Sequence, residues 1–453
     1  MKKLFGTDGI RGLAGGEIIN EDLAFRLGQA LVRYCQIKNI KPEIIVGRDT
    51  RISGPFLETS LSRGVKRAGG QTISTGVIPT PAIAYLAKSE KAGLGLVISA
   101  SHNTHEHNGF KIFKNNGTKL TDDEEETMVK LIIAADDLNT LTRADATAAE
   151  IKFREKIANN YGEKYAQFLK NISEADNLTG IKIILDCANG ATSAVAPEIY
   201  EKLGARVEII FNSPDGQNIN KDCGSEHTEN LQKAMVEREA DIGLAFDGDG
   251  DRLIAVTEKG ERLTGDHLLY ICAKMLKEKN ELKNNLVVST VISNLGFING
   301  LKNLGIKYSQ TDVGDQPVYN ALVAEEGSLG GEESGHLIFL DQHTTGDGIL
   351  SGLMLLKVIK HFNQPLSELA KEFPLMPKIL LNFKVKSKPD LSTVPEINQA
   401  IKEAEDYFGD QGRVLVRYSG TEPLCRVMIE GRDEKEVKAY VEKIGEVINN
   451  VLN

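Results

Sequence analysis

Short apolar runs alternate with amphipathic helical patterns along most of the chain. Apolar runs of this length, bounded by turn residues, favour buried strands. One such strand, ending in a polar turn, is predicted at residues 43–49, 181–190 and 285–291. A Gly-rich apolar strand that ends in a polar loop follows each of them, at 93–103, 242–247 and 327–336. The pattern therefore predicts three copies of one structural unit.

Helical patterns fill the intervals between these strands, for example at 57–68 and 228–238. Strands that alternate with helices form largely parallel sheets, and their ligands bind at the carboxyl ends of the strands. The sequence thus predicts three related α/β domains with mixed, largely parallel sheets. Each domain would contribute one polar loop to a shared site.

Domain boundaries follow from changes in this pattern. A small, polar stretch at 140–150 precedes an amphipathic helix that is expected to open the second domain. Phe373-Pro-Leu-Met-Pro377 is interpreted as a linker, and the helix that closes the chain is expected to be capped by Asp433. The predicted domains are 1–150, 151–256 and 257–372, followed by a smaller α+β domain at 376–453.

The acidic loop Asp247-Gly-Asp249-Gly-Asp251-Arg252 lies between two apolar strands. Three carboxylates separated by glycines can turn toward one point, where only a cation relieves their repulsion. Ligation by oxygen alone selects a hard ion such as Mg²⁺. An EF-hand needs glycine where Arg252 stands and helices on both sides. A solvated acidic turn and a phosphatase nucleophile at Asp247 remain as alternatives.

A hydroxyl stands at the end of the strand that precedes Ser99-Ala-Ser101-His102-Asn103. The G-x-S-x-G elbow of hydrolases is absent, and His102 is expected to point away from its neighbour Ser101. A serine that carries a phosphoryl group near Mg²⁺ fits the acidic loop, because the cation offsets the phosphate charge. A structural cap is the alternative. Lys111 begins the next strand, where a surface position is the alternative to a catalytic one.

Three further segments combine polar groups with glycines. Glu332, Ser334 and His336 would suit a polyhydroxylated ligand, and His336 could transfer a proton near neutral pH. A second segment, near the C-terminus, is a candidate phosphate cradle and contains Arg417, Ser419, Gly420 and Thr421. The third segment is Gly6–Gly12, where Arg11 stands between glycines that allow close approach of a ligand. A polar turn with a core histidine is the alternative for the first segment, and a capped turn is the alternative for the second.

The composition narrows the class of protein. The 453 residues carry a net charge of −10, which argues against a nucleic-acid partner. No apolar run is long enough for a membrane span, and the N-terminus lacks the features of a signal peptide. Five scattered cysteines without a C-x-x-C pair indicate reduced thiols, so a cytoplasmic location is expected. The sequence leaves monomer and homodimer open.

Four loops taken in order resemble the α-D-phosphohexomutase family: S-A-S-H-N, D-G-D-G-D-R, G-E-x-S-G-H and R-x-S-G-T-E-P. The resemblance covers almost the whole chain. The residue sequences of three segments most resemble the branch of the family that acts on glucosamine phosphates: Phe5–Gly12, Thr344–Gly348 and Ser419–Pro423. A branch that acts on glucose or mannose phosphates is the alternative.

The resemblance implies four domains around a central cleft and a role for each motif. Ser101 matches the phosphoryl carrier and a further Mg²⁺ ligand, beside the aspartates Asp247, Asp249 and Asp251. The remaining matches concern protons, charge and substrate. They are Lys111 and His336 as acid/base candidates, Arg11 and Arg252 as cations of the catalytic centre, Glu332 and Ser334 for sugar hydroxyls, and Arg417, Ser419, Gly420 and Thr421 for the non-reacting phosphate.

The activity implied by the resemblance is an isomerase reaction on a small phosphosugar. Phosphoserine would convert glucosamine 6-phosphate to a 1,6-bisphosphate, which turns and returns its other phosphate, feeding UDP-N-acetylglucosamine and cell-wall precursors. A hexosamine or hexose 1,6-bisphosphate would act as activator. A Mg²⁺-dependent sugar phosphatase and a non-catalytic sugar-phosphate binding protein are alternatives of other classes.

The chain departs from the family pattern at several positions. Thr104 stands where proline is usual and His107 where aspartate is common. Gln316-Pro317 replaces the usual Arg-Tyr, so an expected substrate-facing arginine is missing. Glu333 also differs from related enzymes, which tend to have Gln, Asn or Met. These replacements put phosphate contact from the third domain in doubt and could loosen the loop beside Ser101.

Overall fold

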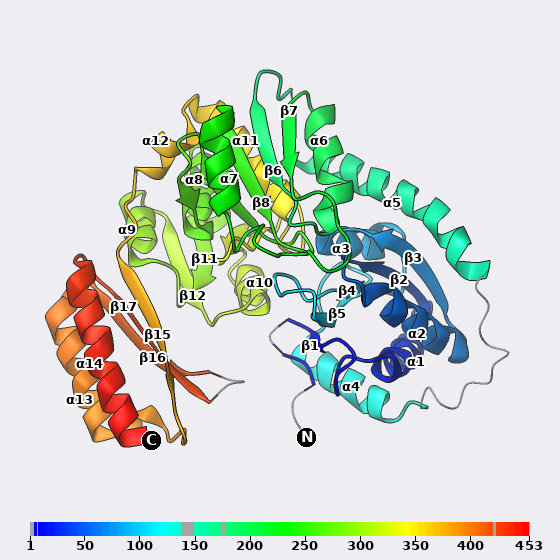
Figure 1. Cartoon of the computed structure of the whole chain (residues 1–453), viewed down its shortest axis with the longest axis horizontal. Coiled ribbons are helices and arrows are strands. Elements are labelled where there is room, and N and C mark those ends of the chain that lie inside the picture. The colour runs from blue at the N-terminus through cyan, green and yellow to red at the C-terminus, as the bar shows by residue number, and fades with distance from the viewer. Residues whose placement is uncertain (1–3, 7, 137–148, 174–176, 420–422, 453) are drawn as a thin grey trace. The chain divides into compact units, whose positions relative to one another are not determined.

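The computed structural model describes residues 4–6, 8–136, 149–173, 177–419 and 423–452, without the side chains of 149–160. The chain forms two compact units (Figure 1). The first, larger unit comprises Met1–Val291 and Ile306–Ala370, and the C-terminal unit comprises Ile292–Gly305 and Lys371–Asn453. Each unit is described separately below.

The first sheet of the larger unit has the strand order β1-β5-β4-β2-β3. Its strands are β1 (Ile10–Leu13), β2 (Glu43–Arg48), β3 (Gln71–Val77), β4 (Leu94–Ile98) and β5 (His107–Lys114). Strands β2, β3 and β4 are parallel, whereas β5 returns antiparallel to β4. The associated helices are α1 (Glu21–Ile37), α2 (Gly54–Arg67), α3 (Thr80–Ser89) and α4 (Asp122–Ile133). Every residue of β4 is buried, as its unbroken apolar run predicts.

The second and third sheets repeat this arrangement. The second has the order β10-β9-β8-β6-β7 and the third β12-β11-β13-β14. Their strands are β6 (Lys182–Asp186), β7 (Arg206–Ile210), β8 (Ile242–Phe246), β9 (Leu253–Thr257), β10 (Arg262–Leu263), β11 (Leu286–Thr290), β12 (Lys307–Thr311), β13 (Leu329–Gly331) and β14 (Leu337–Phe339). The helices of this part are α6 (Ala196–Lys202), α7 (Glu229–Arg238), α8 (Gly265–Glu278), α10 (Asp315–Ala324), α11 (Gly348–Phe362) and α12 (Leu366–Ala370).

The predicted threefold repeat is confirmed by strand pairing. In each sheet a central strand has parallel neighbours on both sides, as β2, β6 and β11 do. One of those neighbours is followed by an antiparallel strand, in the pairs β4–β5, β8–β9 and β13–β14. The three polar loops singled out in the sequence are the connections within these antiparallel pairs.

The long helix α5 (Ala149–Ser173) connects parts of the larger unit. The ring of Phe168 stacks on that of Tyr85 in α3, with centroids 4.0 Å apart. The hydroxyl of Tyr165 donates to Asp347 Oδ2 at 2.8 Å, at the N-cap of α11. This helix, expected to open the second domain, therefore packs on α3 of the first sheet and on α11, which itself packs on β9 of the second sheet.

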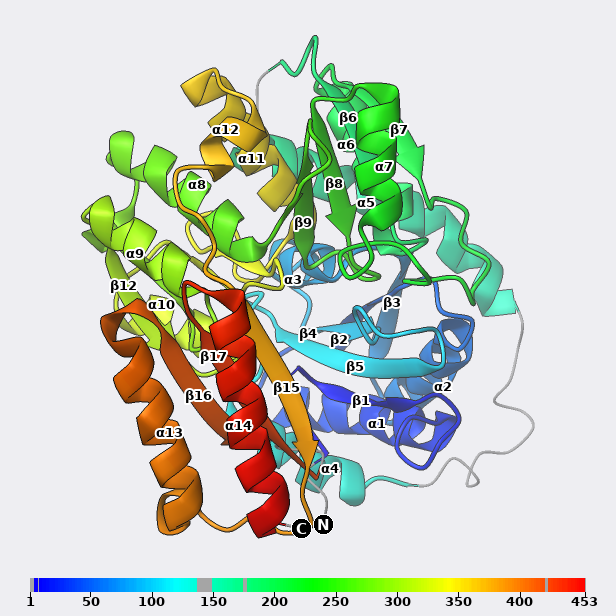
Figure 2. The same cartoon turned by 60° about the vertical axis from the view of Figure 1, so that its left-hand side comes forward.

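The C-terminal unit is an antiparallel sheet with helices on one face (Figure 2). It contains β15 (Lys378–Lys384), β16 (Arg413–Tyr418), β17 (Leu424–Glu430), α13 (Pro395–Phe408), α14 (Glu434–Leu452) and also α9 (Leu295–Asn303). Asp433 Oδ1 accepts from the backbone N–H groups of Lys435 and Glu436, so the predicted cap is confirmed. The short 3-10 turns of the two units are Ala191–Ala194, Lys283–Asn285, Leu391–Thr393 and Gly409–Gln411.

The predicted linker is anchored within this unit. The Asn294 side chain exchanges two hydrogen bonds of 2.9 Å with the backbone of Met376, and Phe373 is buried beside Phe297. The predicted fold class, three α/β domains and a smaller α+β domain, is confirmed.

All five cysteines are buried and unpaired. Within the part of the chain that the structure describes, no helix is both long and apolar enough to cross a membrane.

Candidate active site

The loops after β4 and β8 meet although 146 positions separate their key residues. The hydroxyl of Ser101 donates a hydrogen bond of 2.6 Å to Asp247 Oδ2, and both residues are buried. This contact joins the predicted phosphoryl carrier to the predicted metal loop. Each loop emerges at the carboxyl end of a strand with a parallel neighbour, and the packing of the first sheet against the second brings the two loops together.

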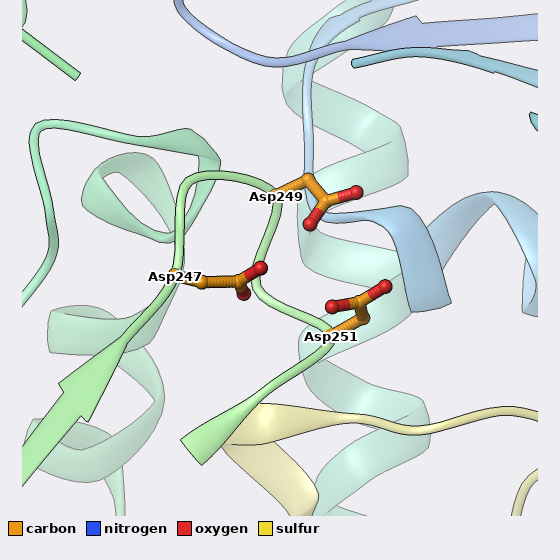
Figure 3. A group of neighbouring side chains, drawn as sticks. All are labelled: Asp247, Asp249 and Asp251. Carbon is orange, nitrogen blue, oxygen red and sulfur yellow. The ribbon is translucent and has the colours of Figure 1, made fainter. Parts of the chain in front are cut away.

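The three aspartates of the acidic loop converge on one point. One carboxylate oxygen from each of Asp247, Asp249 and Asp251 lies within 4.8 Å of the others, and all three residues are buried (Figure 3). Burial raises the pKa of Asp247 well above its usual value, and the neighbouring Asp251 and Asp249 raise it further. A buried carboxyl of this kind favours the proton or a cation over free negative charge.

Glycines allow the acidic loop to approach the serine loop. A Cβ atom at Gly248 would stand 2.7 Å from the carbonyl oxygen of Ser101. Gly250 has φ +73°, a left-handed conformation that a side chain rarely adopts. The alternation of aspartate and glycine therefore serves close packing as well as ligation.

The donor set fits a hard divalent cation. Among the described residues, Asp249 Oδ1 and Asp251 Oδ1 are buried without a hydrogen-bond partner. Their Oδ2 atoms contact the Lys111 ammonium, at 2.9 and 2.7 Å. Buried, unpartnered carboxylate oxygens beside a third carboxylate are a suitable ligand set for Mg²⁺.

Lys111 and Arg11 supply positive charge around the aspartates. Lys111 Nζ also lies 3.0 Å from Asp8 Oδ2, and Arg11 pairs with the same carboxylate. Burial would lower the pKa of Lys111, but Asp249 and Asp251 outweigh it and raise the pKa well above its usual value. Lys111 is thus held as an ammonium, and the surface position considered for it is wrong.

The third loop places His336 beside the acidic loop, which ends at Arg252. His336 is buried, with Nδ1 3.8 Å from Asp251 Oδ2, while Nε2 accepts from the backbone of Gly346 at 3.1 Å. Burial lowers the pKa of His336, but Asp251 and other carboxylates give a net increase. The backbone N–H of Arg252 donates to Asp247 Oδ1 at 3.2 Å.

Glu332 and Ser334 lie on the same turn as His336. The Glu332 carboxylate accepts from the backbone of Gly314 at 3.0 Å, and burial raises its pKa. The Ser334 hydroxyl oxygen is buried without a hydrogen-bond partner among the described residues. These two side chains offer acceptors and a hydroxyl to a polyhydroxylated ligand.

The expectation for His102 was wrong. Its Nδ1 lies 3.4 Å from Ser101 Oγ, although the two residues are adjacent in the chain. The contact is possible because Ser101 has φ +53°, which turns the backbone back on itself. Burial lowers the pKa of His102 to about 3, and the cations Arg252 and Arg11 contribute, so the ring is neutral at pH 7.

Arg51 was missed by the sequence interpretation. This fully buried guanidinium pairs with Asp49 at 2.8 Å and donates to four carbonyl groups of the serine loop. Those carbonyls belong to Ser101, Asn103, Thr104 and His107. The signal in the sequence was the pair Asp49 and Arg51, an acidic and a basic residue directly after the buried strand β2. Arg51 binds only backbone carbonyl groups of this loop, so the side-chain replacements Thr104 and His107 leave these hydrogen bonds intact.

Lys119 was also missed. Its ammonium bridges Asp8, at 2.5 Å, and Asp315 from the start of α10. Asp315 in turn lies 3.8 Å from His336 Nε2. Gln316, which stands in place of the usual arginine, donates to Asn320 along α10 at 3.1 Å. Positive charge beside Asp315 therefore comes from the first sheet.

The C-terminal candidates belong to the other unit. Arg417 lies opposite Arg426 in the β16–β17 ladder, and Lys388 Nζ donates to the Ser419 carbonyl at 2.6 Å. Gly420 and Thr421 lie outside the described residues. Lys388 thus contacts Ser419, and Arg417 and Arg426 form a cross-strand pair in the same hairpin.

Comparison with known proteins identifies matches along the chain. Four models of phosphoglucomutase/phosphomannomutase domains match in order: α/β/α domain I at residues 2–139, domain II at 163–260, domain III at 264–376 and the C-terminal domain at 380–447. A phosphoglucosamine mutase of Syntrophobacter fumaroxidans is 47% identical over 453 residues and one of Syntrophus aciditrophicus is 45% identical, with 100% of each chain covered.

Solved structures share the fold at lower identity. A phosphoglucomutase/phosphomannomutase family protein of Burkholderia thailandensis has a TM-score of 0.79 at 22% identity, covering 100% of this chain and 99% of its own. The N-acetylphosphoglucosamine mutase of Aspergillus fumigatus, in complex with GlcNAc-6P and magnesium, has a TM-score of 0.70 at 17% identity, covering 99% and 96%.

Proposed function

The chain belongs to the phosphoglucomutase/phosphomannomutase family, and we propose that it interconverts glucosamine 6-phosphate and glucosamine 1-phosphate as a phosphoglucosamine mutase. The observation that carries the proposal is the hydrogen bond from Ser101 to Asp247 inside the aspartate cluster. A hydroxyl that can carry a phosphoryl group stands directly at a site suited to a divalent cation.

Asp247, Asp249 and Asp251 would hold Mg²⁺, together with the phosphorylated Ser101. When bound, the ion offsets the negative charge of the transferring phosphoryl group. The chain's own contribution is positioning and fixed positive charge, because phosphoryl transfer requires little covalent chemistry from the protein. Arg11, Lys111 and Arg252 supply that charge.

In the first half-reaction, the bond between Ser101 Oγ and phosphorus breaks. A new bond forms from phosphorus to O1 of glucosamine 6-phosphate, giving the 1,6-bisphosphate. O1 loses a proton, which we assign to His336 as acceptor, and the serine oxygen gains one, which we assign to the ammonium group of Lys111 as donor. After the bisphosphate turns, the same steps run in reverse with the 6-phosphoryl group, and glucosamine 1-phosphate leaves.

Other residues hold the sugar during this sequence. Glu332 and Ser334 bind its hydroxyl groups, and Arg417, Ser419, Gly420 and Thr421 bind the phosphate that is not reacting. One cradle must accept a phosphate at either end of the sugar, which suits charge and hydroxyl groups better than a shaped pocket. A 1,6-bisphosphate would phosphorylate Ser101 initially, and the enzyme would work in the cytoplasm.

Phosphorus NMR of the purified protein with Mg²⁺ and a trace of hexose 1,6-bisphosphate tests the proposal. Glucosamine 6-phosphate, glucose 6-phosphate and mannose 6-phosphate would be compared, with Ser101→Ala as the control. The fastest growth of a sugar 1-phosphate signal is expected from glucosamine 6-phosphate, and none is expected from the control.

Two other outcomes would change the proposal. Release of inorganic phosphate that survives in Ser101→Ala would indicate a phosphatase that uses Asp247. A faster reaction with glucose 6-phosphate or mannose 6-phosphate would retain the mechanism and replace the substrate.

A further inference from the structure

A side chain from the loop after β7 reaches the serine loop. Asn220 is buried and lies in the segment between β7 and α7, next to the second sheet. Its Nδ2 donates to the carbonyl of Ser101 and to the carbonyl of Asn103, both at 2.9 Å. The two hydrogens of this amide are therefore both used on the serine loop.

The same two carbonyls also accept from Arg51. Its Nη2 lies 3.0 Å from the Ser101 oxygen and 2.8 Å from the Asn103 oxygen. Each carbonyl thus has one donor from the first sheet and one from the segment beside the second sheet. Since a carbonyl oxygen has two lone pairs, the pair of donors satisfies each oxygen fully.

Ser101 needs such support because its backbone conformation is unfavourable. Its φ of +53° lies in the left-handed region, which a non-glycine residue adopts at a cost and keeps only where the surroundings enforce it. The Ser101 N–H donates to Ser99 Oγ at 2.9 Å, so donors and an acceptor hold both sides of the residue. The conformation directs the hydroxyl toward Asp247.

Asn220 also lies against the metal loop. A Cβ atom at Gly248 would stand 2.7 Å from Asn220 Nδ2 and 2.7 Å from the Ser101 oxygen. The Asn220 backbone is fixed in turn, because its N–H donates to the carbonyl of Ala188 at 3.0 Å. Asn220 is therefore packed where the serine loop and the acidic loop touch.

We propose that Asn220 is a positioning residue that sets Ser101 Oγ against the aspartate cluster for phosphoryl transfer. The inference rests on the proposed function, since it concerns the serine that carries the phosphoryl group. Arg51 alone would hold the serine loop to its own sheet. Asn220 in addition fixes the position of the serine loop relative to the metal loop. The distance from Ser101 to Asp247 depends on that relative position.

Phosphorylation of Ser101 by glucose 1,6-bisphosphate, followed by rapid quenching and intact mass, tests the inference. Asn220→Ala is expected to lower the rate constant of phosphoenzyme formation about 10- to 100-fold, because a misplacement of about 1 Å has effects of this size. Asn220→Asp is expected to lower it further, because a carboxylate would face two carbonyl oxygens. In steady state, kcat falls while KM for the sugar phosphate stays within about threefold.

Asn218→Ala is the matched control. Asn218 lies in the same loop, and its side chain bonds to Asp215 and Ser213 within that loop. Its rate constant is expected to equal that of the unmodified enzyme.

The rate constant and the amplitude separate positioning from folding. If Asn220→Ala reduces only the final amount of phosphoenzyme, with an unchanged rate constant, Asn220 merely supports the fold and the inference is overturned. An unchanged rate and amplitude would overturn it as well. If the unmodified enzyme forms no phosphoenzyme, the proposed function fails first.

Discussion

The serine–aspartate junction and the C-terminal hairpin differ in how they hold polar groups. At the junction, Ser101, Asp247 and Arg51 are almost completely buried, and the contacts of each residue reach distant parts of the chain. In the C-terminal unit every residue of β16, including Arg413 and Arg417, is half-buried. One region encloses its charges, whereas the other presents them at a partly exposed sheet.

Under the proposed function, the buried junction would transfer the phosphoryl group and the half-exposed hairpin would bind the phosphate that is not reacting. Buried charges keep a fixed geometry because leaving any of them unpaired costs several kcal/mol, on the order of 3–5. Half-exposed cations retain solvation and can contact a phosphate that arrives in two orientations. Substitutions at the junction should therefore act on kcat, and substitutions in the hairpin on KM.

The largest effect is expected at the metal loop. Asp249→Asn removes one carboxylate charge from the cluster and should lower kcat roughly 1000-fold or more, since charge stabilisation carries most of the rate. Isothermal titration with Mn²⁺ should show a matching loss of metal affinity. The exposed Asp222, changed to Asn, is the control with normal values. Full turnover and normal metal affinity in Asp249→Asn would remove the aspartates from the mechanism.

Asp186 is a buried carboxyl outside the aspartate cluster, so it tests how burial of a charge affects stability, apart from any role in catalysis. Asp186 accepts from the backbone of Ala188 and Gly224, and burial raises its pKa to about 7. The folded state therefore binds a proton that the unfolded state, with a pKa of 3.8, has released above that pH. This group's contribution to stability is full below about pH 4, declines as pH rises to about 7, and is constant above.

Asp186→Asn should remove this decline, which corresponds to at most about 4 kcal/mol. Urea unfolding of both proteins at intervals from pH 4.5 to 7.5 measures the difference in slope. Asp433→Asn, at an exposed helix cap, should keep the slope of the unmodified protein. Identical slopes for Asp186→Asn and the unmodified protein would mean that Asp186 is ionised throughout this range.

In the hairpin, Arg417→Ala should raise KM for the sugar phosphate about 10- to 100-fold and change kcat less, because the proposed contact of this guanidinium with the non-reacting phosphate would be lost. Arg417→Lys should give an intermediate KM, since lysine keeps the charge but not the planar pair of donors. Arg432→Ala, an exposed arginine of the same unit, is the control. A fall in kcat at constant KM would contradict the division between the two regions.

The smallest effect is expected at the helix cap. Asp433→Ala removes the acceptor for two N–H groups at the start of α14 and should cost about 1 kcal/mol of unfolding free energy. The thermal midpoint of the C-terminal unit measures this loss, and kcat at a temperature well below it should not change. An unchanged midpoint would show that water replaces the cap.

Much of the architecture was predictable because its causes are local. Apolar runs bounded by turns predicted β2, β4, β6, β8 and β11, and the repeated order predicted the shared sheet pattern. The acidic loop was recognisable because three carboxylates and their glycines are close in sequence. The placement of α5 was not predictable, since its amphipathic pattern specifies an apolar face and leaves the partner open.

By itself, the sequence determined the order of the polar loops, the strand ends that carry them and the residue types available at each. Only the tertiary structure decided that Ser101 donates to Asp247, that Lys119 joins Asp8 to Asp315, and that Arg51 and Asn220 share two carbonyls. These contacts depend on how whole sheets pack. Hydrophobic periodicity specifies which face of an element is buried, but not which distant polar group will meet it there.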